Sequence, residues 1–320
     1  MRKDRESGRF LQVLSTLLAA LVVALLIQGF NRTDSGHEER AERGVIHYQV
    51  GSLKLPDTLY FAGERMPLEN FDTRESLDRE LLISAYRHSA TIAIIKRANR
   101  FFPVIEPILA EYGVPDDFKY LAIAESDLLN LVSPVGATGF WQIMRATGRE
   151  YGMEINTEVD ERYHLEKSTH VACRYLLNSY ERYGSWTMAA AAYNGGNRGV
   201  DRQIEIQDET NYYDLLLTEE TARYVFRIAS YKLIFENLEE YGFFIDPADY
   251  YPVIPYEEVA VDTAVAGFAD FAKKFGTTYK NLKYLNPWLR RPYLNNPRRN
   301  TYMIKVPEPG YRTVVNVVEE

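Results

Sequence analysis

The sequence predicts a mainly α-helical protein that begins with an apolar segment and ends in a small α+β module. Three observations support this fold class. Apolar residues recur at helical spacing, with interruptions, from about residue 74 to residue 241. Residues 257–306 begin and end with the alternation of apolar and polar residues that is typical of strands. Residues 10–27 are nearly free of charge and follow a basic stretch.

The N-terminal segment is expected to direct export. Eighteen residues, 10–27, are just long enough to cross a membrane, and the basic residues before them favour a cytoplasmic start. No pattern of small residues that would suit signal cleavage precedes Asn31. We therefore expect residues 1–30 to be an N-terminal membrane-anchor helix that holds the protein at the periplasmic face of the inner membrane. The alternative is a cleaved signal sequence and a protein secreted to the periplasm.

The helical region is expected to span residues 66–250, after a polar, weakly patterned linker over residues 31–65. Glycines such as Gly113 and Gly184 follow several apolar periodic runs, as they do at helix ends. The predicted helices are 74–99, 103–112, 115–126, 140–151, 166–183, 186–193 and 218–240.

A domain boundary is expected near residues 252–258, where prolines cluster and the charge changes sign. The net charge is −15 over residues 31–258 and +5 over residues 259–320. The module that follows, residues 256–308, is predicted as strand, helix, helix, strand, and residues 309–320 as a tail. Its predicted elements are 257–262, 267–275, 279–285 and 301–306.

Glu125 is an acidic residue where an apolar one is expected. It shares one helical stripe with Phe118, Leu121 and Ala122. Burial of a carboxyl group raises its pKa, and a carboxyl that keeps its proton near neutral pH can act as a general acid. The alternative is a glutamate that pairs with a nearby arginine or turns to solvent at the helix end.

Two further motifs combine glycine with amide or phenol side chains. Gly136, Gly139 and Gln142 stand three residues apart. Glycine lets the backbone approach a ligand closely, and the amide of Gln142 offers both a donor and an acceptor. In AAAAYNGGN, Tyr193 and Asn194 stand where two glycines end a helix. Each motif suits a pocket wall, although a loop-to-helix junction or a packed core tyrosine would look the same.

Together these motifs resemble those of the family 1 soluble-lytic-transglycosylase catalytic domains, which are related to goose-type lysozyme. Glu125-Ser126 resembles the catalytic Glu-Ser pair, GATGFWQ the Gly-x-x-Gly-x-x-Gln motif, and AYNGG the Ala-Tyr-Asn-x-Gly motif. The stretches YG at 151–152, DER at 160–162 and ETARYV at 220–225 are similar to the membrane-bound lytic murein transglycosylase D type. The resemblance covers about residues 68–246 and implies a lysozyme-like helical fold.

The C-terminal module resembles a LysM domain, a βααβ unit that binds peptidoglycan. FADFAKKFGTTYKNLKYLNP is similar to its two helices and TYMIKVP to its last strand. Val261-Asp262-Thr263 replaces the usual Gly-Asp-Thr turn, and the insert WLRRPYLNNPRRN is long. The module is therefore LysM-like but degenerate, and it could bind glycan or serve only to pack.

The resemblance implies an enzyme that acts on peptidoglycan glycan strands and uses a single catalytic residue, Glu125. This acid would cleave the β-1,4 bond between N-acetylmuramic acid and N-acetylglucosamine and leave a 1,6-anhydromuramic acid end. The alternatives are a hydrolytic muramidase on the same scaffold and a non-catalytic peptidoglycan-binding scaffold. The substrate-binding residues implied by the resemblance are Ser126, Ser133, Gly139, Gln142, Tyr193, Asn194 and Tyr224.

No cofactor or metal is expected. The five histidines do not fall at the spacing of metal ligands. The single cysteine, Cys173, excludes an internal disulfide and is expected to be a small core residue. Nucleic acid is not an expected partner for an exported protein whose helical region is acidic.

Overall fold

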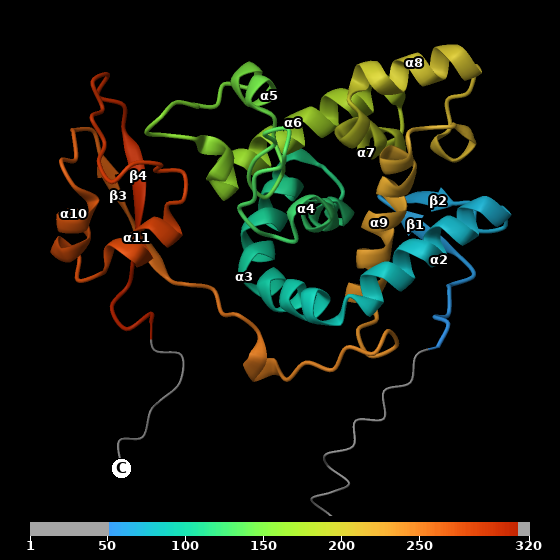
Figure 1. Cartoon of the computed structure of the whole chain (residues 1–320), viewed down its shortest axis with the longest axis horizontal. Helices are drawn as coiled ribbons and strands as arrows, with labels where there is room; N and C mark the ends of the chain where they lie inside the picture. Colours follow the sequence, from blue (N-terminus) through green and yellow to red (C-terminus); the bar gives the residue numbers. More distant parts are fainter. Residues whose placement is uncertain (1–50, 313–320) are drawn as a thin grey trace, which may run out of the picture. The chain divides into compact units, whose positions relative to one another are not determined.

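The computed structural model describes residues 51–312 (Figure 1). Leu53–Glu320 form one compact unit, which is described as far as residue 312. Helices make up 53% of the structure, so the predicted mainly α-helical class is confirmed. The predicted anchor, residues 10–27, and most of the predicted tail lie outside the described residues. Within the described range, no helix has the length and apolar character needed to cross a membrane.

A β-hairpin precedes the helices and corrects the predicted linker, 31–65. Strands β1 (Leu59–Phe61) and β2 (Glu64–Met66) pair antiparallel. The two residues between them, Ala62 and Gly63, both have positive φ, as a tight two-residue hairpin turn requires. Leu59, Phe61 and Met66 are buried in the main core. Strands of three residues are too short to show an alternating pattern in the sequence.

The first two helices are divided differently from the prediction. Helix α2 (Phe71–Tyr86) ends at Arg87, and helix α3 (His88–Tyr112) continues through two prolines, Pro103 and Pro107. The predicted helices 74–99 and 103–112 are therefore wrong in their boundaries. Both prolines are exposed and lie four residues apart, on one face of α3. The carbonyls that lose a hydrogen bond can therefore reach water, and the helix persists.

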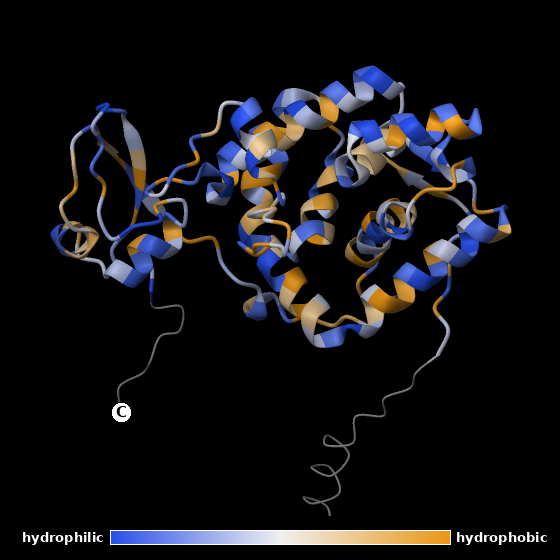
Figure 2. Cartoon of the chain, turned by 45° about the horizontal axis from the view of Figure 1, so that its top comes forward, coloured by the Kyte–Doolittle hydropathy of each residue, from blue (hydrophilic) through white to orange (hydrophobic). Residues whose placement is uncertain are grey.

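The remaining helices are α4 (Lys119–Ser126), α5 (Arg145–Glu150), α6 (Leu165–Tyr183), α7 (Trp186–Gly195), α8 (Asn197–Gln207) and α9 (Glu219–Glu236). Helix α4 contacts both α3 and α9, while α2 packs on α9 and α6 packs on α3 and α7 (Figure 1). The longer helices carry both hydrophobic and hydrophilic residues along their length (Figure 2). The predicted helix 140–151 begins only at Arg145, because Thr138 and Ile143 pair in a β-bridge, and α8 was not predicted.

The C-terminal module has the predicted strand, helix, helix, strand order. Its elements are β3 (Tyr256–Val261), α10 (Phe268–Lys274), α11 (Tyr279–Leu285) and β4 (Tyr302–Pro307). The two strands pair antiparallel.

The core of the C-terminal module is completed by the helical region. Val159 and Tyr163 belong to the same buried cluster as Phe268, Leu282 and Ile304 of the module. Backbone hydrogen bonds reinforce this joint: Asp160 N donates to Trp288 O over 2.9 Å, and Arg290 N donates to Glu158 O over 2.7 Å. The two regions are therefore packed together and not merely linked by the chain.

Candidate active site

Glu125 lies in the last turn of α4, where the helix stops. Asp127 and the residue after it both have positive φ, which ends the helical hydrogen bonding. The Glu125 side chain is half-buried, and the phenol of Tyr224 donates a hydrogen bond to its Oε1. Tyr224 comes from α9, which packs along α4. The sequence-predicted partners Glu125 and Tyr224 are thus brought into direct contact from positions 99 residues apart.

The environment of Glu125 favours its protonated form. Burial raises its pKa to about 7, and the negative charge of Glu220 acts in the same direction. The Tyr224 hydrogen bond and the positive charge of Arg227 lower the pKa, but they do not offset the burial. The alternative of a glutamate that turns to solvent does not fit this half-buried, hydrogen-bonded side chain. A carboxyl with this pKa can give up and recover a proton near neutral pH.

Two tyrosines, the buried Tyr224 and the half-buried Tyr193, interact electrostatically with Glu125. Tyr224 is 1% exposed, and burial raises the pKa of its phenol well above 10, so it stays a proton-bearing donor. The pKa of Tyr193 is also raised well above 10 by burial, with a further contribution from the charge of Glu125. Its hydroxyl donates to Trp141 O over 2.7 Å. Tyr193 therefore fixes the loop that carries Gln142.

Two predicted substrate-binding residues, Ser126 and Gly139, have structural roles. Ser126 is 3% exposed, and its hydroxyl donates to Phe140 O over 2.8 Å. Gly139 has φ +85°, and a Cβ at this position would lie 2.0 Å from the carbonyl oxygen of Arg162. Both residues hold the 131–143 loop against the rest of the protein, and their assignment to substrate binding stays a prediction.

Ser133 occupies a turn in the same loop. Its Oγ accepts a hydrogen bond from Ala137 N over 3.0 Å, and its backbone carbonyl accepts one from Gly136 N over 2.9 Å. It does not line the cavity that contains Gln142, Tyr193 and Asn194. Its assignment to substrate binding stays a prediction, whereas its hydrogen bonds give it a clear role in shaping the turn.

Gln142, Tyr193 and Asn194 are brought together at one cavity of about 300 Å³. Gln142 has φ +44°, and its Nε2 donates to Gly139 O over 2.8 Å. Asn194 Oδ1 accepts from the hydroxyl of Thr221, on α9, over 2.9 Å. Three of the predicted residues thus form one wall, and its polar groups are held at fixed orientations. Such a wall suits the hydroxyl and amide groups of a sugar.

Sequence reasoning missed a buried ionic cluster behind Tyr224. Glu80, on α2, is 1% exposed and accepts a hydrogen bond from Arg223 Nε over 2.7 Å. Its other oxygen lies 3.6 Å from Arg227 Nε. These two arginines flank Tyr224 in the sequence of α9, so the cluster ties that helix to α2. The signal was available, because Glu80 shares the apolar face of its helix with Leu77, as Glu125 does with its own neighbours.

Among residues 51–312, no group of three or more His, Cys, Asp or Glu side chains is placed to hold a metal ion. Cys173 is buried and fully packed, as the sequence predicted. Burial raises the pKa of its thiol to about 12, which makes it unreactive.

Comparison with known proteins defines the class of the two regions. Residues 103–216 match the family model of the Transglycosylase SLT domain, and residues 257–310 match that of the Soluble lytic transglycosylase C-terminal LysM-like domain. The chain therefore carries a transglycosylase SLT domain followed by a LysM-like domain. This confirms both resemblances seen in the sequence.

Individual proteins with a similar sequence or structure are also found. Over 239 residues, the chain is 27% identical to Membrane-bound lytic murein transglycosylase D of Escherichia coli (strain K12). The matched region covers 72% of this chain and 51% of the relative. The same values hold for the protein of that name in Escherichia coli O6:H1. The chain thus spans about half the length of the curated relatives it matches. A solved structure of an inactive mutant of lytic transglycosylase Slt from Pseudomonas aeruginosa is 20% identical, with a TM-score of 0.38, and covers 56% of this chain and 35% of that one.

Proposed function

We propose that this protein is a peptidoglycan lytic transglycosylase with Glu125 as its single catalytic acid and base. The observation that carries the proposal is the half-buried carboxyl group of Glu125, whose pKa is raised to about 7 and which accepts a hydrogen bond from Tyr224. The SLT domain match and the relatives support the substrate class. The bond cleaved would be the β-1,4 bond between N-acetylmuramic acid and N-acetylglucosamine.

In the first step, the Glu125 carboxylic acid gives its proton to the glycosidic oxygen, and the bond from that oxygen to the muramic acid anomeric carbon breaks. In the second step, the muramic acid C6 hydroxyl attacks this carbon, and the Glu125 carboxylate accepts the hydroxyl proton. A 1,6-anhydro ring is formed, and Glu125 returns to its protonated form. Between the steps, the Tyr224 hydroxyl stabilises the carboxylate by a charge-assisted hydrogen bond.

Two aspartates that could have served as a second carboxylate are held in ion pairs, which supports this single-acid route. Most glycoside hydrolases use two carboxylates that flank the bond. Asp127 is ion-paired with Arg87 over 2.8 Å, and Asp160 is buried in an ion pair with Arg162. Neither group is free to act as the second carboxylate beside Glu125. A substrate hydroxyl as the attacking group removes the need for an activated water.

The experiment is digestion of purified sacculi by the detergent-solubilised full chain, with mass spectrometry of the products. The proposal expects anhydromuropeptides, which are lighter by one water than hydrolysis products, and expects Glu125→Gln to abolish them. Reducing-end products would indicate the hydrolytic alternative. Lysis that persists in the Glu125→Gln variant would remove Glu125 from its role.

We further propose a cell-envelope location, as the name of the membrane-bound relative suggests. In this proposal residues 10–27 anchor the protein at the periplasmic face of the inner membrane. A high-salt wash of isolated membranes tests it, because an anchored protein stays in the membrane pellet. Release by salt would indicate a protein freed by signal cleavage.

A further inference from the structure

A second cavity lies beside the first and includes an arginine from the C-terminal module. It has a volume of about 470 Å³ and is formed by the 132–145 loop, the 156–163 segment and Arg290. Met144 lines both this cavity and the one that contains Gln142 and Tyr193. The two cavities therefore adjoin across one half-exposed methionine side chain.

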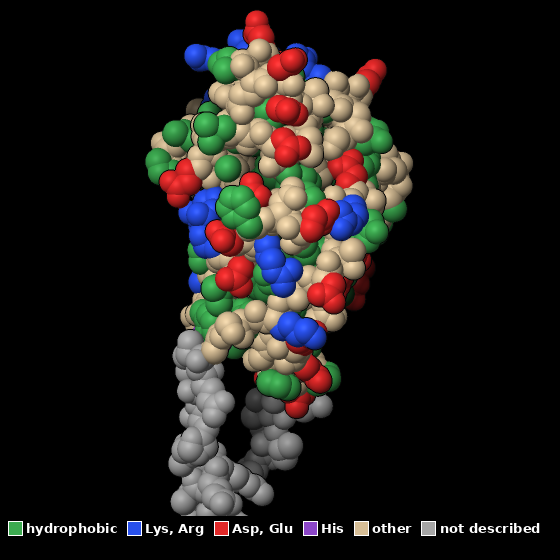
Figure 3. Space-filling model, turned by 90° about the vertical axis from the view of Figure 1, so that its right-hand side faces the viewer, with side chains coloured by type: hydrophobic (Ala, Val, Ile, Leu, Met, Phe, Trp, Pro, Cys, Tyr) green, Lys and Arg blue, Asp and Glu red, His purple; other side chains and the backbone are tan. Residues whose placement is uncertain are grey.

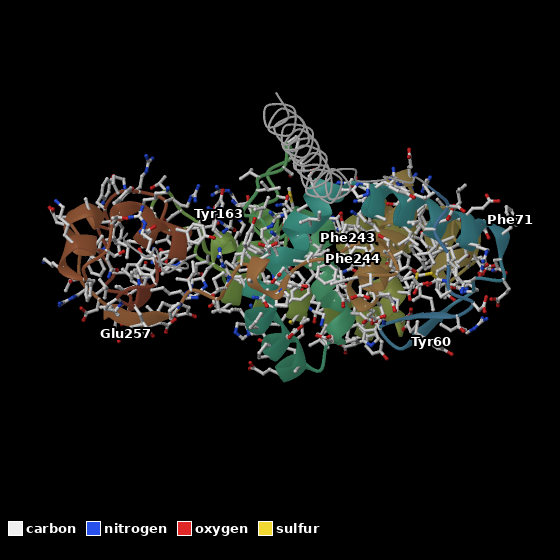
Figure 4. The ribbon with its side chains drawn as sticks, turned by 90° about the horizontal axis from the view of Figure 1, so that it is seen from below. Tyr60, Phe71, Tyr163, Phe243, Phe244 and Glu257 are labelled. Carbon is white, nitrogen blue, oxygen red and sulfur yellow. The ribbon has the colours of Figure 1, made fainter. Side chains whose placement is uncertain are left out.

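Arg290 is held rigidly at this site. Its guanidinium carbon lies 3.9 Å from the centre of the Tyr163 ring, and its Nη1 donates to Pro287 O over 2.8 Å. Its backbone N donates to Glu158 O across the joint between the two regions. Figure 4 shows Tyr163 where the helical region meets the C-terminal module. Because Arg290 is ordered before any ligand arrives, binding to it costs little side-chain entropy.

The charge of this cavity is positive. Three arginines line it: Arg145, Arg162 and Arg290. Arg162 is neutralised by Asp160 through two hydrogen bonds of 2.9 and 2.7 Å, and its remaining Nη1 donates to backbone carbonyls. Within the part of the chain that the structure describes, Arg145 and Arg290 form no ion pair with an acidic side chain. The cavity thus presents two uncompensated guanidinium groups. At the opposite end of the helical region, acidic side chains are interspersed with basic ones (Figure 3).

We propose that this cavity binds a carboxylate of the peptide stem carried by muramic acid, through Arg145 and Arg290. The inference rests on the proposed function, because it concerns the same substrate. Guanidinium groups bind carboxylates through paired, charge-assisted hydrogen bonds. The exposed apolar side chains of Val132 and Val135 offer a surface for the aliphatic part of a peptide. The insert of the C-terminal module therefore contributes to substrate selection by the SLT domain, whether or not the module binds glycan itself.

The test compares the full chain on two substrates: glycan strands that carry stem peptides, and the same strands after an amidase has removed the peptides. The measured quantity is the ratio of kcat/KM on the first substrate to kcat/KM on the second. Arg290→Gln is expected to lower this ratio about tenfold, as loss of a charge-assisted hydrogen bond would. Arg290→Lys, which keeps the charge, should recover part of it. Arg291→Gln is the matched control, because Arg291 is exposed and does not line the cavity, and it should leave the ratio unchanged.

Salt gives a second readout. Added salt should lower the ratio for the unmodified protein and have less effect on Arg290→Gln, because salt screens an exposed ion pair. An equal fall in kcat/KM on both substrates would overturn the inference, since it would mean that Arg290 supports the fold or contacts glycan. An unchanged ratio would overturn it as well.

The outcome stays separate from that of the proposed function. If the unmodified protein releases no anhydro products, the proposed function fails. Binding of soluble stem peptide to the Glu125→Gln variant, measured by titration calorimetry with and without Arg290→Gln, still tests the inference. Equal binding with and without the Arg290 substitution would overturn it.

Discussion

The raised pKa of Glu125 makes a prediction about stability that needs no substrate. The pKa of its carboxyl is raised from 4.5 to about 7 in the folded protein. The folded state therefore holds this proton more tightly than the unfolded state does. The stabilisation from Glu125 is complete below pH 4.5 and is lost as the pH rises through about 7. At 1.36 kcal/mol for each pKa unit, the loss amounts to about 3 kcal/mol. This is an upper bound, because the side chain is only half-buried.

The assay is urea unfolding of the protein and of Glu125→Gln between pH 4 and pH 8. Every other titratable group is the same in both proteins, so the difference in free energy of unfolding isolates the titration of Glu125. We expect the variant to gain up to about 3 kcal/mol relative to the unmodified protein over this range, with most of the change between pH 4.5 and 7. A difference that stays constant with pH, or that falls, would refute the reasoning, since it would mean that the carboxyl is well solvated.

Three further substitutions have expected outcomes. Tyr224→Phe removes a hydrogen bond that lowers the pKa of Glu125. The alkaline limb of the pH dependence of kcat/KM should therefore move up by about one pH unit, the equivalent of about 1.5 kcal/mol. A pH–rate profile in which this limb does not move would contradict the expectation. Gly139→Ala introduces both left-handed strain and a clash with a backbone carbonyl, so urea unfolding should show a loss of more than about 3 kcal/mol. Glu80→Gln removes the buried carboxylate from Arg223, which keeps only the exposed Glu219 at 3.5 Å. A loss of about 3 kcal/mol is expected in the same measurement, and a loss below about 0.5 kcal/mol would show that water replaces the pair.

The sequence predicted the character of the site better than its contacts. Helical periodicity placed Glu125 on an inward face, and burial alone determines the direction of its pKa shift. Periodicity does not reveal which atoms a polar side chain meets. Ser126 follows Glu125 directly, yet its hydroxyl bonds to the 131–143 loop and not toward the cavity. The role of Gly139 likewise depends on Arg162, which is distant in the sequence and fixed only by the tertiary fold.

Some predicted element boundaries were wrong for local structural reasons. Pro103 suggested a helix start, but Pro103 and Pro107 both face water, where unpaired carbonyls carry little penalty, and the helix continues through them. The hairpin was missed because two strands of three residues carry too few positions to reveal a period of two. Glu80 lies on the same kind of apolar stripe as Glu125, but no glycine or amide motif stands beside it in the sequence to mark it as a special residue.

The shared core of the C-terminal module has a consequence for dissecting the protein. Val159 and Tyr163 fill the interior of a module that begins nearly a hundred residues later. A truncation at the proline-rich boundary near residue 252 would uncover apolar surface on both fragments, and each would tend to self-associate or open locally. The boundary that is visible in the chain is therefore not a place where the molecule divides. Fragments that lack the module would report on a damaged joint as much as on a missing function.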